Sequence, residues 1–154
     1  LNKHSIGIEI NNPGHENKYK KFSLKQIRSL VKLLKYLLRE YKVNKSNVLG
    51  HSDISPDRKK DPGEKFPWKM LAKNKVCSWH TLNEKKIKSY RNKKISKKEE
   101  RLLVKNLYKI GYTKKIQKNS SLLIKAFQRK FRQQLVNGKI DRECFLISKN
   151  LIKS

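Results

Sequence analysis

The segment from His51 to Gly63, which reads HSDISPDRKKDPG, is the part of this sequence that most restricts the fold. His51 and Asp61 cannot share one helix face, because Pro56 interrupts the segment and Pro62 ends it. We therefore predict a loop that folds back and brings His51 next to Asp61.

An imidazole and a carboxylate in such a loop are a suitable ligand pair for a borderline cation such as zinc. A catalytic zinc commonly takes three protein ligands and leaves one position open. His51 and Asp61 would be two of the three, and the alternative is an unrelated pair of surface residues. Asp53, two residues after His51, is a candidate for helix capping or for orienting a metal ligand through a hydrogen bond.

Two charged residues near these candidates are of types suited to amide hydrolysis. Residues 6–10 alternate between isoleucine and either glycine or glutamate, which predicts a strand with Glu9 on the face opposite the isoleucines. In a cleft Glu9 could act as general acid and base, and the alternative is a solvated carboxylate on an edge strand. Lys59 could stabilise the oxyanion of an amide reaction, although most lysines in so basic a chain are merely solvated.

Three separated stretches together resemble the zinc-dependent N-acetylmuramoyl-L-alanine amidases, and most closely the bacterial anhydro-muropeptide amidases. They are residues 5–10, residues 51–63 and Phe66-Pro67-Trp68, and the likeness extends from Asn2 to about Trp79. The resemblance implies an α/β fold with a mixed central sheet flanked by helices, as in peptidoglycan recognition proteins. It also implies zinc binding by His51 and Asp61, catalysis by Glu9 and assistance from Lys59.

The sequence departs from this family at the first zinc ligand. In the family this ligand is a histidine on an early strand, and it has no counterpart in a chain that begins at Leu1. We expect either a fragment that is incomplete at its N-terminus or a protein that lacks this ligand. His4 and His15 lie nearby and could replace it, although we favour surface loop positions for both. His80 matches no residue of the family.

Two further residues are candidate substrate contacts. Asn11 begins a predicted loop, residues 11–21, which in the family borders the substrate groove. Trp68 could form a wall for a sugar ring or close the core, whereas we expect Phe66 to lie in the core.

Residues 23–41 predict a helix with one buried face. Ser23 and Gln26 have the spacing of a capping box. Apolar residues recur behind them at intervals of three and four, namely Ile27, Leu30, Val31, Leu34, Leu37, Leu38 and Tyr41. We expect this face to pack on the predicted sheet.

A lysine-rich stretch at residues 83–100 predicts a linker between a catalytic unit, residues 1–82, and a second unit, residues 101–154. Apolar stripes in the second unit predict a bundle of three short helices: Leu102, Leu103, Leu107 and Ile110 before Gly111; Leu123, Ala126, Phe127 and Phe131; and Cys144, Phe145, Leu151 and Ile152. Residues 126–128 and 137–141 resemble the helical peptidoglycan-binding domain of cell-wall hydrolases. We expect Asn137 and Gly138 to form a turn and Asp141 to cap the last helix.

The chain carries 40 Lys and Arg residues against 12 Asp and Glu residues, a formal net charge of +28. Such a surface would attract nucleic acid or anionic wall polymers alike. The cations are spread over nearly every segment rather than gathered in one stripe, which disfavours a specific nucleic-acid site.

No apolar run of about 18 residues is present, which predicts no transmembrane helix. For Cys77 and Cys144 we favour two buried free thiols over a disulfide.

These features predict an N-acetylmuramoyl-L-alanine amidase that uses zinc-activated water to cleave the amide between N-acetylmuramic acid and L-alanine. The substrate would be peptidoglycan or anhydro-muropeptides. We expect a monomer in the bacterial cell envelope, in the periplasm or at the outer membrane. A non-catalytic peptidoglycan-binding module on the same fold and a basic nucleic-acid-binding protein are the two alternatives.

Overall fold

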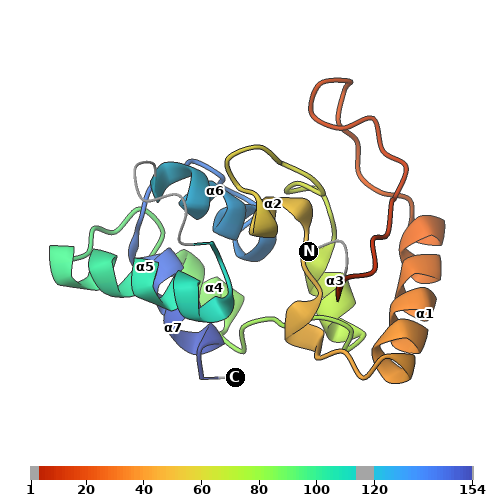
Figure 1. Cartoon of the computed structure of the whole chain (residues 1–154). Helices are drawn as coiled ribbons and strands as arrows, with labels where there is room; N and C mark the ends of the chain where they lie inside the picture. Colours follow the sequence, from red (N-terminus) through yellow and green to blue (C-terminus); the bar gives the residue numbers. More distant parts are fainter. Residues whose placement is uncertain (1–3, 114–119, 154) are drawn as a thin grey trace.

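The computed structural model describes residues 4–113 and 120–153, and within these ranges all regular structure is helical (Figure 1). In chain order the elements are α1 (Leu24–Glu40), the 3-10 helix η2 (Lys45–Asn47), α2 (His51–Ile54), α3 (Trp68–Lys73), α4 (Glu84–Lys88), α5 (Lys97–Ile110), α6 (Ser120–Phe131) and α7 (Arg142–Leu151). Several of these helices are very short, so the loops between them hold much of the candidate site.

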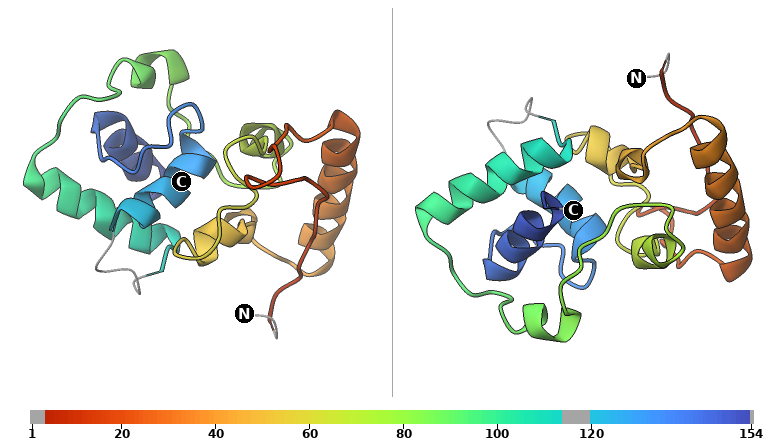
Figure 2. Two further views of the ribbon diagram at one scale, coloured as in Figure 1. Left: turned by 90° about the horizontal axis from the view of Figure 1, so that it is seen from above. Right: turned by 90° about the horizontal axis from the view of Figure 1, so that it is seen from below.

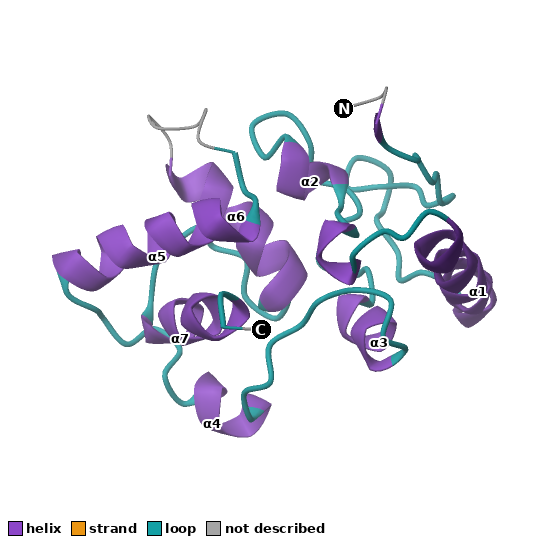
Figure 3. Cartoon of the chain, turned by 60° about the horizontal axis from the view of Figure 1, so that its bottom comes forward, coloured by secondary structure: helices purple, strands orange, loops and turns teal. Residues whose placement is uncertain are grey.

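The predicted mixed sheet is wrong, because Figure 3 shows only helices and loops in the described parts of the chain. A strand is stable when its backbone groups pair with a neighbouring strand, and residues 5–10 have no such neighbour within residues 4–113 and 120–153. Ile8 and Ile10 instead pack against the hydrophobic cluster under α1, while Ile6 is 52% exposed. The alternating pattern therefore reflects partial burial at Ile8 and Ile10, and it does not indicate strand pairing.

Helix α1 confirms the predicted capping box. The Ser23 hydroxyl accepts a hydrogen bond from the Gln26 backbone N–H, and the Gln26 side chain accepts one from the Ser23 N–H at 3.0 Å. The buried residues of α1 are Ile27, Leu30, Val31 and Leu34, whereas Tyr41 at its C-terminal end is 61% exposed. The apolar face thus covers loops and α3 rather than a sheet.

The core consists of two hydrophobic clusters, and both views of Figure 2 show the corresponding helices as two groups side by side. The first cluster joins α1 to α3 and the loop before it through residues such as Ile27, Phe66 and Leu71. The second joins α4, α5, α6 and α7 through Ile87, Leu103, Phe127 and Phe145. Trp79 packs against both clusters, so the segment between the two groups is part of the core.

The three helices expected in the C-terminal part of the chain are α5, α6 and α7. Helix α5 ends at Gly111, whose φ of 108° is in the left-handed region that favours glycine. Asp141 caps α7 by accepting a hydrogen bond from the Cys144 N–H at 2.9 Å, and it also forms a buried ion pair with Arg132. The predicted cap therefore also ties α7 to the end of α6.

None of the helices within the described ranges has the length and apolar character needed to cross a membrane.

Candidate active site

The site begins where the chain enters α2 at Gly50. The Gly50 N–H donates a hydrogen bond to Oδ2 of Asp53 at 2.9 Å, so Asp53 caps the helix that starts with His51. A Cβ atom on Gly50 would lie 2.5 Å from Cδ of Pro62 and 3.2 Å from Cζ2 of Trp68. Only glycine lets the backbone approach the returning loop this closely.

The loop after α2 folds back as the sequence predicts. Backbone N–H groups of Arg58 and Lys59 donate to the Ser55 carbonyl at 3.1 and 2.9 Å, which turns the chain. The Ser52 N–H then donates to the Asp61 carbonyl at 3.0 Å. These bonds place the start of α2 beside the end of the loop.

The two predicted metal ligands meet at the end of this loop. Nδ1 of His51 lies 2.6 Å from Oδ2 of Asp61, and the two side chains are 63% and 57% exposed. One imidazole nitrogen and one carboxylate oxygen thus face each other at a surface that a substrate can reach. This donor set fits zinc, which binds both atom types.

Within the described residues, no third His, Cys, Asp or Glu joins this pair to form a group of three. His15, one candidate for the additional ligand, is engaged elsewhere: its Nε2 lies 3.0 Å from Oε2 of Glu64 and its ring stacks on Tyr19. His4 is exposed at the start of the described chain. The described part of the structure therefore brings together the two predicted ligand residues and adds no third.

Residues 11–21 brace the loop that carries Asp61, a role that the sequence did not reveal. The Tyr19 hydroxyl donates to the Pro62 carbonyl at 2.6 Å and accepts from the Lys65 N–H at 2.9 Å. Burial of the phenol raises the pKa of Tyr19 to about 12, so the hydroxyl stays protonated and able to donate. Burial, the largest single effect, opposes ionisation of Glu64. The hydrogen bond with His15, a backbone hydrogen bond and the charges of His15 and Arg129 together outweigh it, and the pKa of Glu64 falls below its ordinary value.

The two predicted catalytic side chains are both exposed. Glu9 lies in the extended segment between Ile8 and Ile10, whose side chains pack into the core, so its carboxylate faces outward. Lys59 follows the turn at Ser55, and its ammonium forms no ion pair with any described residue. No hydrogen bond within the described ranges joins either residue to the His51–Asp61 pair.

The two predicted substrate contacts lie in different environments. Asn11 is exposed, and its carbonyl accepts a hydrogen bond from Nε2 of Gln26 at 2.8 Å. Trp68 is only 3% exposed and packs edge-on against Phe66 in the first hydrophobic cluster. A ring so deeply buried closes the core, which was the other role considered for it, and Phe66 lies in the core as expected.

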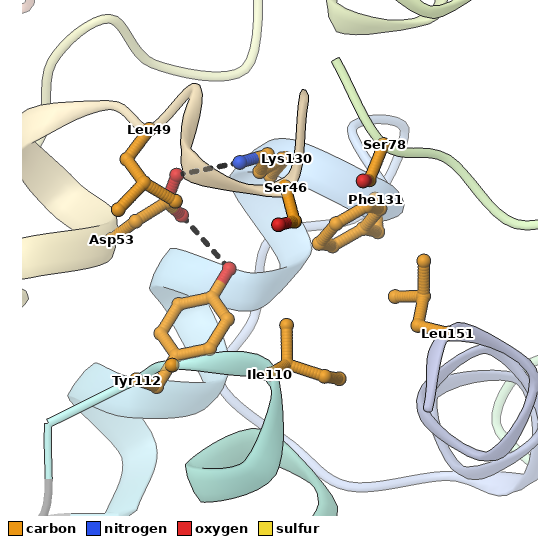
Figure 4. A pocket seen from close by; sticks show the side chains of 10 residues that line it. Ser46, Leu49, Asp53, Ser78, Ile110, Tyr112, Lys130, Phe131 and Leu151 are labelled. Carbon is orange, nitrogen blue, oxygen red and sulfur yellow. Dashed lines mark hydrogen bonds and ion pairs between the residues drawn. The ribbon is translucent and has the colours of Figure 1, made fainter. Parts of the chain in front are cut away.

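Asp53 also contacts two side chains from the C-terminal half of the chain, one from the segment after α5 and one from α6, and the sequence did not predict these contacts. Oδ1 accepts a hydrogen bond from the Tyr112 hydroxyl at 2.8 Å, and Oδ2 lies 3.0 Å from the Lys130 ammonium (Figure 4). Burial, followed by the negative charge of Asp53, holds the pKa of Tyr112 well above its ordinary value, so the hydroxyl remains a donor. No local pattern could have identified these partners, which lie 59 and 77 residues away in the chain.

Residues 1–64 match the family model described as N-acetylmuramoyl-L-alanine amidase. The N-acetylmuramoyl-L-alanine amidase AmiD of Escherichia coli (strain K12) is 32% identical over 161 residues, which cover 99% of this chain and 58% of AmiD. The 1,6-anhydro-N-acetylmuramyl-L-alanine amidase AmpD of Haemophilus influenzae is 38% identical over 68 residues, which cover 44% of this chain and 35% of AmpD.

Solved structures of similar proteins agree in fold. The complex of E. coli AmiD with the substrate anhydro-N-acetylmuramic acid-L-Ala-D-gamma-Glu-L-Lys has a TM-score of 0.84 over 99% of this chain and 63% of that chain, at 32% identity. AmpDh3 of Pseudomonas aeruginosa has a TM-score of 0.74 over 88% of this chain and 55% of that chain, at 28% identity. The chain thus spans less than two thirds of the length of the relatives it matches.

Proposed function

Because the chain is 32% identical to the N-acetylmuramoyl-L-alanine amidase AmiD over 99% of its length and residues 1–64 match the amidase family model, we propose that its protein is an amidase of this kind. The reaction is hydrolysis of the amide between the lactyl group of N-acetylmuramic acid and the L-alanine of the stem peptide. The pairing of His51 with Asp61 at 2.6 Å carries the proposal, since both residues lie in the segment that matches the family model.

Zinc is the proposed cofactor, and His51 and Asp61 are the residues that would hold it. Both side chains are more than half exposed, which leaves room for a substrate beside them. When bound, zinc supplies a Lewis acid that activates water and polarises the amide carbonyl.

The chain's own residues would handle the proton and the developing charge. We assign to Glu9 the removal of a proton from the attacking water and its delivery to the leaving amine of L-alanine. We assign to the Lys59 ammonium the stabilisation of the carbonyl oxygen as it gains negative charge, a type of contact worth about 3 kcal/mol of barrier. Its lack of an ion-pair partner within the described chain leaves this ammonium available to a substrate.

Anhydro-muropeptides, or the same linkage in intact peptidoglycan, are the proposed substrates. The solved AmiD complex holds a ligand of this class, and the formal net charge of +28 suits the carboxylates of stem peptides. We propose that residues 101–154 bind the wall, that residues 83–100 connect them to the catalytic residues 1–82, and that the protein acts as a monomer in the bacterial envelope.

The test uses the full-length natural protein, with anhydro-N-acetylmuramyl tripeptide as the substrate. The products are identified by mass spectrometry. We expect release of anhydro-N-acetylmuramic acid and free tripeptide, abolished by a chelator and restored by zinc. His51→Ala should lose the reaction, whereas His4→Ala, which changes an exposed histidine, should retain it. A protein that releases no product under any of these conditions would contradict the proposal.

A non-catalytic wall-binding module remains the second candidate, because only two candidate ligands meet within the described residues. It predicts that the protein sediments with purified peptidoglycan and releases no product from it. The product assay therefore separates the two functions.

A further inference from the structure

Asp53 lies at a point where the N-terminal and C-terminal groups of helices meet. Its carboxylate accepts hydrogen bonds from the Gly50 N–H, the Tyr112 hydroxyl and the Lys130 ammonium, at 2.9, 2.8 and 3.0 Å. Figure 4 shows Tyr112 and Lys130 reaching Asp53 from the C-terminal side, at the edge of a cavity of about 70 Å³. The carboxylate that caps α2 is thus satisfied mainly by residues outside α2.

Lys130 makes further contacts around the start of α2. Its ammonium donates to the Val48 carbonyl at 3.1 Å and lies 4.4 Å from the centre of the Trp68 ring. It therefore contacts the chain on both sides of the Gly50–His51 peptide unit. The side chains of Lys130 and Asp53 are only 6% and 4% exposed. Removing either partner would leave the other charge buried and unpaired, so loss of one partner destabilises the fold.

His51 lies at the start of the element that these contacts surround. It is the first residue of a helix of only four residues, which is too short to be stable on its own. Its imidazole is mostly exposed and has Asp61 as its hydrogen-bond partner. The backbone next to His51 is therefore held by the hydrogen bond from Gly50 to Asp53 and by the bond from the Ser52 N–H to the Asp61 carbonyl. The Asp53 carboxylate is in turn held by Lys130 of α6 and by Tyr112.

We infer that Asp53, Lys130 and Tyr112 form a positioning network through which the C-terminal helices hold His51 in the orientation that metal binding requires. This inference rests on the proposed function, because the metal is the one proposed for His51 and Asp61. The C-terminal helices would then contribute to the metal centre itself, besides any contact they make with the wall. Groups that orient metal ligands typically change metal affinity about 10- to 100-fold when they are removed.

The test compares zinc affinity, measured by competition with a chelator, among single variants of the protein as its cell makes it. Lys130→Met removes the cation and keeps most of the volume, and we expect it to weaken zinc binding about 10-fold or more. Tyr112→Phe removes one hydroxyl and nothing else, and it should weaken zinc binding by a smaller factor. This conservative change keeps the test decisive even where Lys130→Met fails to fold.

Asp141→Asn is the matched control, because it weakens a buried ion pair with Arg132 that lies within the C-terminal helices and does not touch α2. It should lower the unfolding temperature but leave zinc affinity at the wild-type value. Equal losses of zinc affinity in Asp141→Asn and Lys130→Met, at matched loss of stability, would overturn the inference. Wild-type zinc affinity in both folded Lys130→Met and Tyr112→Phe would overturn it as well.

A readout without zinc separates this inference from the proposed function. In the metal-free protein, Tyr112→Phe should shift the His51 ring signals in NMR spectra and speed hydrogen exchange at the Gly50 and Ser52 amides. These changes should occur even in a protein that binds no zinc, in which case the proposed function would fail and the positioning would stand. Unchanged signals and exchange rates would refute the positioning directly.

Discussion

Nδ1 of His51 lies 2.6 Å from Oδ2 of Asp61, although the two residues are ten positions apart and lie in a segment that no helix could span. The turn at Ser55 and the bond from the Ser52 N–H to the Asp61 carbonyl bring them together. Gly50 allows the loop to close, because a Cβ atom at this position would lie 2.5 Å from Cδ of Pro62 and 3.2 Å from Cζ2 of Trp68. The geometry of the pair is therefore a property of the whole loop.

Gly50→Ala should disturb this loop. Its new methyl group would lie 2.5 Å from Cδ of Pro62, and since Pro62 and Trp68 are both rigid, the backbone must shift. We expect a loss of about 1–3 kcal/mol in unfolding free energy, measured by urea denaturation. Gly7→Ala is the control, because nothing lies within 4 Å of a Cβ atom at that position. Equal stability of the two variants would show that the loop tolerates the shift.

Glu9→Gln should abolish hydrolysis and preserve substrate binding. The amide has nearly the size of the carboxylate but cannot accept the proton from water. Turnover of anhydro-muropeptide and its dissociation constant, measured by calorimetry, give the two quantities. Glu16→Gln changes another exposed carboxylate outside the proposed mechanism and should leave both unchanged. Normal turnover by Glu9→Gln would remove Glu9 from the reaction.

Acidification should destabilise the protein through His80. Burial disfavours the charged imidazolium and lowers the pKa of His80 below its ordinary value of 6.5; the charge of Lys69 adds to this effect, whereas the charges of Glu84 and Glu143 oppose it. The unfolded chain then binds a proton at higher pH than the folded one, so stability that is fully present above pH 6.5 is lost as the pH falls from that value through the lower pKa of the folded state.

The measurement is the change in unfolding free energy between neutral pH and pH 5 for the wild type and for His80→Gln. We expect a smaller change in the variant, whose side chain does not titrate. His4→Gln, at an exposed histidine, serves as the control. Identical pH dependence in all three proteins would rule out a contribution from His80.

Both cysteines should be inert in the native protein. Cys77 and Cys144 are free and buried, as the sequence favours, and burial raises the pKa of the two thiols to about 11 and about 12. Since the thiolate is the reactive form, a thiol reagent at neutral pH should label neither residue until denaturant is added. Rapid labelling of the folded protein would indicate that one of the thiols is accessible.

The sequence predicted those parts of the fold that depend on nearby residues. The capping box at Ser23, the left-handed stop at Gly111 and the cap at Asp141 each involve partners a few positions away, and all three are present. The predicted central sheet was wrong because the alternation at residues 6–10 corresponds only to partial burial of Ile8 and Ile10, whereas a strand requires a partner strand that no local pattern can reveal. The contacts of Lys130 and Tyr112 with Asp53 could not be predicted for the same reason, because these residues lie 77 and 59 positions from Asp53 in the sequence.

The proposed active site requires that His51 and Asp61 bind one metal ion together. Zinc content after dialysis against a weak chelator, determined by mass spectrometry for the wild type, His51→Ala and Asp61→Ala, tests this most directly. We predict about one zinc per wild-type chain and a loss of most of it in each variant. Full zinc retention in both variants would place the metal elsewhere and contradict the account.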